Sequence, residues 1–197
     1  MVTEGDYSKA KTTDVTTRSG SPTINNGIAV PFIIEGGSSD TTGPGRVQID
    51  TSDAPVSSKD DMVLVDPSDD SALTYFFERF DPSNEFYSGW VYFSSLPRDG
   101  STQIKLLFGD GPTGGNEESG RTTVFSGVSG LQLRPNLATS SGTIRDDSGN
   151  NYDSIDRSIS GYEQTNSDFI GKAIRLDSSS NDYVNFGTGA TKTMPTH

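Results

Sequence analysis

The chain lacks several residues and motifs on which enzymes depend. None of its 197 residues is cysteine, so disulfides, thiolate metal sites and cysteine nucleophiles are excluded. The one histidine, His197, is the last residue of the sequence, which argues against a histidine-based triad or general base. The sequence also has no Gly-x-Ser-x-Gly elbow and no Gly-Lys-Ser/Thr phosphate loop. We therefore predict a protein without catalytic activity.

Apolar residues are also scarce, at 30% of the chain. No run approaches the roughly 20 apolar residues that cross a bilayer, which predicts no membrane span. The polar N-terminus lacks the apolar segment of a secretory signal. The chain is therefore expected to stay with its cell, to leave as part of a particle, or to have lost its original start. The absence of Asn-x-Ser/Thr sequons disfavours a glycosylated cell-surface coat protein.

Positive charge is the third shortage. Fifteen Lys and Arg face 27 Asp and Glu, giving a net charge of −12, spread along the chain and dominated by Asp. This charge disfavours nucleic-acid binding, which needs a basic footprint, and we predict no nucleic-acid partner. In molar salt, where the Debye length is about 3 Å, this self-repulsion would be screened. The charge pattern therefore favours a protein of a halophile, the alternative being an ordinary acidic surface protein.

The residues that are present indicate strands and turns. Short apolar runs alternate with clusters of Ser, Thr, Asp and Gly, and no segment has a helical stripe. This predicts an all-β protein, an antiparallel β-sandwich domain followed by a partial jelly-roll-like domain. The predicted parts are a polar arm over 1–26, the sandwich over 27–109, a Gly- and Pro-rich linker over 110–121 and the partial domain over 122–197. The arm is either disordered or an anchor that becomes ordered on a partner.

Strands are expected at 28–34, 46–50, 62–65, 73–80, 88–93 and 103–108, and more weakly at 122–125, 130–133, 173–176 and 183–186. Pro31 inside the first run predicts an edge strand or a bulge. Because Leu96–Gly100 reads as a turn, the runs 88–93 and 103–108 are predicted to form an antiparallel hairpin.

Five segments of the first domain form a recognisable pattern: Tyr75–Phe80, Gly89–Phe93, Ser95–Pro97, Gly100–Thr102 and Ile104–Gly109. Over about residues 26–109 this pattern resembles a small β-domain of unknown function found in large archaeal and bacterial surface proteins. That family has a Tyr-Trp-x-Glu strand, a Trp-Val-x-Val-Pro strand, a glycine turn and an Ile-x-Leu-x-Tyr-Gly strand. Phe108 replaces the tyrosine of the last motif, a departure from the pattern.

Three later segments, Asp146–Asn150, Gly171–Asp177 and Asp182–Gly187, are similar to the opening strands of a laminin-G or concanavalin-like lectin domain. The two families often occur in this order in one chain. A complete jelly roll has eight strands and needs roughly twice the residues that follow the linker. We therefore expect either a longer parent chain or strands supplied by an oligomer, since unpaired edges aggregate.

Two candidate sites emerge from the side chains. Calcium binds six to eight oxygens, and the closely spaced Asp146, Asp147, Asn150 and Asp153 could supply them, although a self-satisfied Asx-rich turn is the simpler interpretation. Exposed members of the aromatic runs could stack on a glycan or form a subunit interface, although aromatic residues in a β-domain are usually core. The candidates are Tyr87, Trp90 and Tyr92.

The carboxylate pairs of the chain could also be considered for a glycosidase. The pairs Asp69–Asp70 and Glu117–Glu118 lie in turn or linker segments, where adjacent carboxylates are expected to be solvated surface.

These features favour a structural or attachment protein of a halophilic virus, such as a tail fibre, spike or turret component, that docks into the virion through its N-terminal part. We expect a homo-oligomer, with a trimer favoured, that contacts other virion proteins. The alternative is a carbohydrate-binding adhesin module of a haloarchaeal cell-surface protein, located outside the cell and binding a surface glycan. A third possibility, an enzyme, would need a catalytic domain beyond this sequence.

Overall fold

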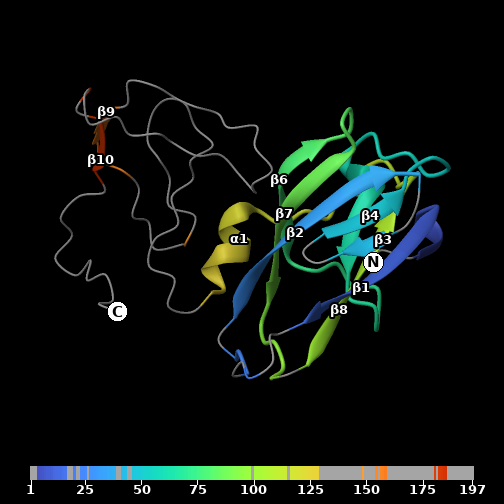
Figure 1. Ribbon diagram of the computed structural model, residues 1–197, viewed down its shortest axis with the longest axis horizontal. Coiled ribbons are helices and arrows are strands. Elements are labelled where there is room, and N and C mark those ends of the chain that lie inside the picture. Colours follow the sequence, from blue (N-terminus) through green and yellow to red (C-terminus); the bar gives the residue numbers. More distant parts are fainter. Residues whose placement is uncertain are drawn as a thin grey trace.

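The computed structural model describes residues 4–16, 20, 23–25, 27–38, 41–43, 46–98, 100–114 and 116–128, together with 148, 154, 156–158, 180 and 182–185. Its main body is an all-β fold of two sheets, as the sequence predicts (Figure 1). One sheet has the order β1 (Lys9–Thr16), β8 (Ser101–Phe108) and β5 (Met62–Val65). The other has the order β3 (Thr41–Gly43), β4 (Arg46–Asp50), β2 (Ile28–Gly37), β7 (Phe86–Phe93) and β6 (Tyr75–Asp81).

The remaining elements are short. Two 3₁₀ turns, η1 (Glu4–Asp6) and η2 (Lys59–Asp61), precede β1 and β5, and a short helix, α1 (Arg121–Ser126), follows β8. Further along the chain, β9 (Asp156–Ser158) and β10 (Tyr183–Asn185) form an antiparallel pair. The predicted strand at 183–186 therefore exists over three residues, whereas those at 130–133 and 173–176 lie outside the described residues.

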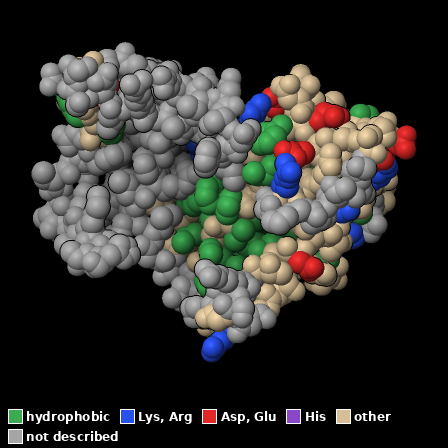
Figure 2. All heavy atoms as spheres, in the orientation of Figure 1, with side chains coloured by type: hydrophobic (Ala, Val, Ile, Leu, Met, Phe, Trp, Pro, Cys, Tyr) green, Lys and Arg blue, Asp and Glu red, His purple; other side chains and the backbone are tan. Residues whose placement is uncertain are grey.

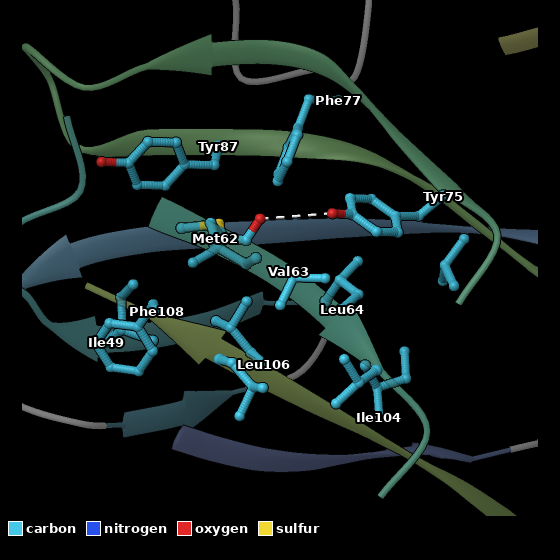
Figure 3. Close-up of a cluster of buried hydrophobic side chains, with 14 of the residues drawn as sticks. Ile49, Met62, Val63, Leu64, Tyr75, Phe77, Tyr87, Ile104, Leu106 and Phe108 are labelled. Carbon is cyan, nitrogen blue, oxygen red and sulfur yellow. Dashed lines mark hydrogen bonds between the residues drawn. The ribbon is translucent and has the colours of Figure 1, made fainter. Parts of the chain in front are cut away.

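Side chains from both main sheets form one hydrophobic core, which makes the arrangement sandwich-like. On β8 the residues Ile104, Leu106 and Phe108 are all buried, on the face that their alternation predicts. Figure 3 shows them beside residues of β5 and β4, with the Tyr75 hydroxyl donating to the Met62 carbonyl oxygen at 3.4 Å. Period two thus correctly identifies these three core side chains, but Leu107 between them is also fully buried, which the alternation does not predict.

The predicted hairpin between 88–93 and 103–108 is wrong. Strands β7 and β8 belong to different sheets: β7 pairs with β2 and β6, and β8 pairs with β1 and β5. The connection crosses from one sheet to the other, and the buried Leu96 forms an isolated bridge with Ile24 on the way. The hairpin of this region joins β6 to β7 instead, where Glu85 takes a φ of 50°. Strand pairing depends on free edges, which turn residues alone do not reveal.

Pro31 lies where a proline can be tolerated. Strand β2 pairs with β7 from Ile28 to Glu35, but its other side meets β4 only from Ile34 onwards. Within the part of the chain that the structure describes, β2 is therefore an edge strand around Pro31 and an interior strand at its end. The expected edge position is confirmed in this local sense.

Two polar segments that the sequence assigns to an arm and a linker are built into the fold. Part of the arm forms β1, which pairs residue by residue with the whole of β8, from Lys9 opposite Phe108 to Thr16 opposite Ser101. Main-chain pairing needs no apolar pattern, so periodicity gave no sign of it. In the segment 110–121, the Ser119 amide likewise donates to the Tyr75 carbonyl oxygen of β6 and the Gly114 amide donates to Asp60 Oδ2 of η2, and the segment leads into α1.

The predicted strand at 122–125 is also wrong, since Arg121–Ser126 is helical. In a strand, the consecutive Val124 and Phe125 would point to opposite faces. In α1 both side chains are buried, and they form a second small cluster with Phe76 of β6. A segment too short to show helical periodicity is thus shaped by the surface on which it docks.

Candidate functional site

The candidate aromatic residues lie on β7 and divide between the two faces of the five-stranded sheet. Tyr87 is completely buried in the sandwich core, and its hydroxyl donates to the Val56 carbonyl oxygen at 3.3 Å. Burial, followed by the nearby carboxylates, raises the pKa of Tyr87 to about 12, so the phenol stays neutral. The prediction that Tyr87 offers a surface for a glycan or a subunit is wrong, because its position in the strand directs it inward.

Trp90 lies on the opposite, outer face of the sheet, where α1 partly covers it. The Trp90 and Phe125 rings are 5.4 Å apart in an edge-to-face arrangement, and Phe125 contacts Phe76 in the same way at 5.7 Å. Edge-to-face pairs of this kind stabilise packing beyond the area they bury. Trp90 is half-buried, and its ring packs against Phe125 of α1.

Tyr92 is held beside Trp90 by two close backbone approaches. A β-carbon added at Gly127 would lie 2.7 Å from the Tyr92 ring, and one at Gly27 would lie 2.7 Å from its hydroxyl oxygen. Gly27 also has a φ of 78°, which favours glycine. The residue before β2 and the residue after α1 therefore meet at this side chain. Trp90 and Tyr92 thus act as the site where α1 docks.

A patch of hydrophobic side chains remains visible on this outer face, over α1, β2 and β7 (Figure 2). Ala29, Trp90 and Tyr92 surround the small cluster formed by Phe76 and α1. Pro31 projects on the same side of β2 as Ala29 and is exposed. Among the described residues, this outer-face patch is the one that best matches the predicted interface of exposed aromatic side chains.

Next to this patch, the segment 116–120 lies along the free edge of β6, and we call it the edge strap. The Ser119 amide donates to the Tyr75 carbonyl oxygen at 2.6 Å, and the Phe77 amide donates to Glu118 Oε1 at 2.6 Å. The second carboxylate oxygen of Glu118 pairs with Lys59 Nζ at 2.5 Å. One acidic side chain thereby satisfies a main-chain donor of the sheet edge and ties η2 to β6. The second half of the segment that the sequence predicts as a linker is therefore packed against the edge of the sheet.

A second ion pair fixes the start of α1. Arg121 Nη2 lies 3.1 Å from Glu78 Oε1, and the Glu78 side chain is only 6% exposed. The Arg121 guanidinium also lies over the Phe76 ring, 5.2 Å from its centre. Burial of this pair at the edge of β6 fixes where α1 begins.

Several other carboxylates of the sandwich hold turns. The side chains of Asp50, Asp66 and Asp69 each accept the main-chain amide of the serine two residues later. Hydrogen bonds from the serine side chain and amide lower the pKa of Asp50 and of Asp69 below the ordinary value. Asp70 pairs instead with Lys105 at 2.8 Å. The pair Asp69–Asp70 is thus divided between an Asx turn and an ion pair, and Glu117 is exposed beside the half-buried Glu118.

Asp61 is the most enclosed of these carboxylates. Its Oδ2 accepts both the amide and the hydroxyl of Ser57 and of Ser58, at 2.8 to 3.3 Å, in the capping box of η2. Burial acts to raise the pKa of Asp61, but these hydrogen bonds outweigh it and hold the pKa below the ordinary value. The carboxylate therefore holds the loop before β5 in place as a charged group.

The predicted calcium ligands Asp146, Asp147, Asn150 and Asp153 lie outside the described residues, as does His197. Among the residues that are described, no three Asp, Glu or His side chains converge in a way that could hold a metal ion. The calcium site therefore stays a prediction from the sequence.

No family model, no curated protein and no solved structure matches the chain. The two family resemblances of the sequence therefore stay predictions.

Proposed function

We propose that the chain is a structural and attachment protein of a virion that works in concentrated salt, as a tail fibre, spike or turret component. The observation that supports this most directly is the position of β1. It is the end strand of its sheet and is held mainly by pairing with β8. An N-terminal element of this kind can dock onto another protein chain by the same main-chain pairing.

The charge distribution supports the salt-adapted part of the proposal. Six basic side chains of the sandwich each lie within 4 Å of a carboxylate: Lys9, Arg46, Lys59, Arg79, Lys105 and Arg121. Figure 2 shows Lys and Arg side chains beside Asp and Glu on the visible face. With these cations neutralised locally, the excess of acidic groups sets the net field of the surface, which salt would screen.

The adhesin alternative receives less support from the same geometry. A glycan needs an open aromatic face, whereas Tyr87 is buried and Trp90 is partly covered by α1. We therefore rank sugar binding below assembly. In the described part of the chain, no helix is long and apolar enough to cross a membrane.

Location decides between these functions. Cultures that produce the chain are separated in molar salt into particles, cell envelopes and soluble material, and peptides of the chain are quantified in each fraction. We expect the chain in the particle fraction at a fixed ratio to the other particle proteins. Recovery in the envelope fraction, with specific binding on a glycan array, would favour the adhesin. Recovery in soluble material alone would refute both.

Assembly is tested on the purified chain by sedimentation. We expect an oligomer in molar salt that dissociates in low salt, because unscreened acidic surfaces repel one another. A monomer that is insensitive to salt would refute the assembly role.

A further inference from the structure

We propose that the N-terminal segment 4–16, here called the exchange arm, passes between copies of this chain, so that β1 of one copy completes the sheet at β8 of the next. The partner is therefore a second copy of the same chain. This inference rests on the proposed assembly function, but its test measures only whether β1 strands exchange between copies.

Strand β1 of the arm contributes little to the core of its own copy. The β1 side chains alternate between half-buried and exposed, and none is fully buried. Of these side chains, Val15 packs against the core, while Lys9 pairs with Asp50 at 3.6 Å. Apart from the Tyr7 ring, little apolar burial is therefore lost while the arm is detached, because the transfer term scales with apolar area.

The site that β1 would leave strongly favours refilling. Strand β8 carries the buried Leu106, Leu107 and Phe108 in the middle of the sheet. Without β1, one side of the eight-residue strand β8 would be an open edge, with every second residue presenting its main-chain donor and acceptor beside this core. A β1 strand from any copy satisfies that edge equally well, since the register and contacts are the same.

A buried tyrosine gives the arm a specific seat. Tyr7, just before β1, is 7% exposed and belongs to the main core cluster. The backbone fits closely around it: a β-carbon at Gly111 would lie 2.8 Å from the Tyr7 ring and 1.9 Å from the Asp60 carbonyl oxygen. The next amide, that of Ser8, donates to the Gly109 carbonyl oxygen at 2.9 Å. This seat fixes the register at which a β1 strand enters.

The connection to the rest of the chain permits the exchange. Ile24 and Leu96 exchange two main-chain hydrogen bonds, of 3.0 and 2.8 Å, which fix the chain to the sandwich at that point. The seven residues 17–23 separate Thr16 from this clamp and can span at most about 25 Å, at roughly 3.3 to 3.6 Å per residue. That reach would limit the exchange to a copy in direct contact with the first. Exchange of an identical element is a low-cost route to closed oligomers.

The absence of native cysteine allows a direct test. Asp14 and Gln103 lie opposite each other on β1 and β8, both are exposed, and Gln103 Nε2 donates to Asp14 Oδ1 at 3.2 Å. Asp14→Cys and a larger, tagged Gln103→Cys variant are mixed in molar salt, incubated at high protein concentration and oxidised. We expect a disulfide-linked heterodimer on a non-reducing gel, well above the homodimer formed by either variant alone.

The double variant Asp14→Cys/Gln103→Cys gives the second readout. Exchange links chains into covalent multiples of the chain mass, and three linked chains would correspond to the expected trimer. An internal β1 gives a single cross-linked chain. Cross-linking only within single chains at every concentration, with no heterodimer from the mixture, would overturn the proposal. The particle fractionation measures only where the chain is located. Failure of the cross-linking test and failure of the proposed function can therefore be told apart.

Discussion

Among the side chains of the edge strap, Glu118 is the one whose removal is expected to lower the free energy of unfolding most. It accepts the Phe77 amide at 2.6 Å and pairs with Lys59 at 2.5 Å, and its side chain is only 14% exposed. Glu118→Ala removes the acceptor of the Phe77 amide, and Phe77 is a buried residue of β6. The substitution also releases η2 from β6, because Lys59 then has no carboxylate to bind at this edge.

The expected cost follows from these two contacts. A hydrogen bond from a buried amide to a charged acceptor contributes about 1.5–3 kcal/mol. The ion pair adds roughly 0.2–1 kcal/mol, because the Lys59 side chain is 38% exposed and partly screened. We expect Glu118→Ala to lower the free energy of unfolding by about 2–3 kcal/mol, a drop in Tm of about 5–10 °C for a chain of this size. Glu118→Gln keeps an oxygen for Phe77 and should lose only about 1 kcal/mol.

Denaturant unfolding at one fixed salt concentration measures these values, followed by the far-ultraviolet signal of the sheets. Glu117→Ala is the matched control, since the neighbouring Glu117 is exposed and carries the same charge. Surface substitutions usually change stability by less than about 0.5 kcal/mol. Equal destabilisation by Glu118→Ala and Glu117→Ala would show that the Glu118 contacts do not hold the edge strap on β6.

Two further predictions concern α1 and the capping box. Phe125→Ala should weaken the docking of α1 by about 3 kcal/mol and shift the fluorescence emission of Trp90, the one tryptophan, to the red. The control Thr122→Ala, on the exposed side of α1, should change neither quantity. Unchanged emission in Phe125→Ala would contradict the contact between Phe125 and Trp90. Asp61→Asn should lower stability at neutral pH by about 1–3 kcal/mol. Because the folded pKa of Asp61 lies below its unfolded value near 3.9, its contribution is complete above that value and is lost as the pH falls through the folded pKa. The variant should therefore approach the native chain in stability below about pH 4, and a constant gap across an acid titration would refute this role.

Local sequence pattern correctly predicted burial where the orientation of a side chain depends only on its position within its own strand. The alternation of Ile104, Leu106 and Phe108 correctly predicted their burial, and Pro31 correctly predicted a local edge. The same alternation could have placed Tyr87 in the core, because Tyr87 and Trp90 differ by an odd number of residues and so face opposite sides. The candidate set combined both faces of one strand.

Long-range partners could not be predicted in this way. Polar residues of β1 form a strand because β8 offers a free edge, and Glu118 becomes structural because the Phe77 amide lies within reach. Neither segment carries a periodicity, since main-chain pairing and single hydrogen bonds leave none in the sequence.

The sequence by itself determined that the fold is all-β, that cysteine chemistry is excluded and that the net charge is strongly acidic, since these follow from composition and local alternation. Only the tertiary structure decided that β7 and β8 belong to different sheets, that α1 covers Trp90 and that the N-terminal residues close the smaller sheet. The physical reason is that free strand edges and buried surfaces arise only when distant segments meet, and those contacts then choose the conformation of the short segments around them.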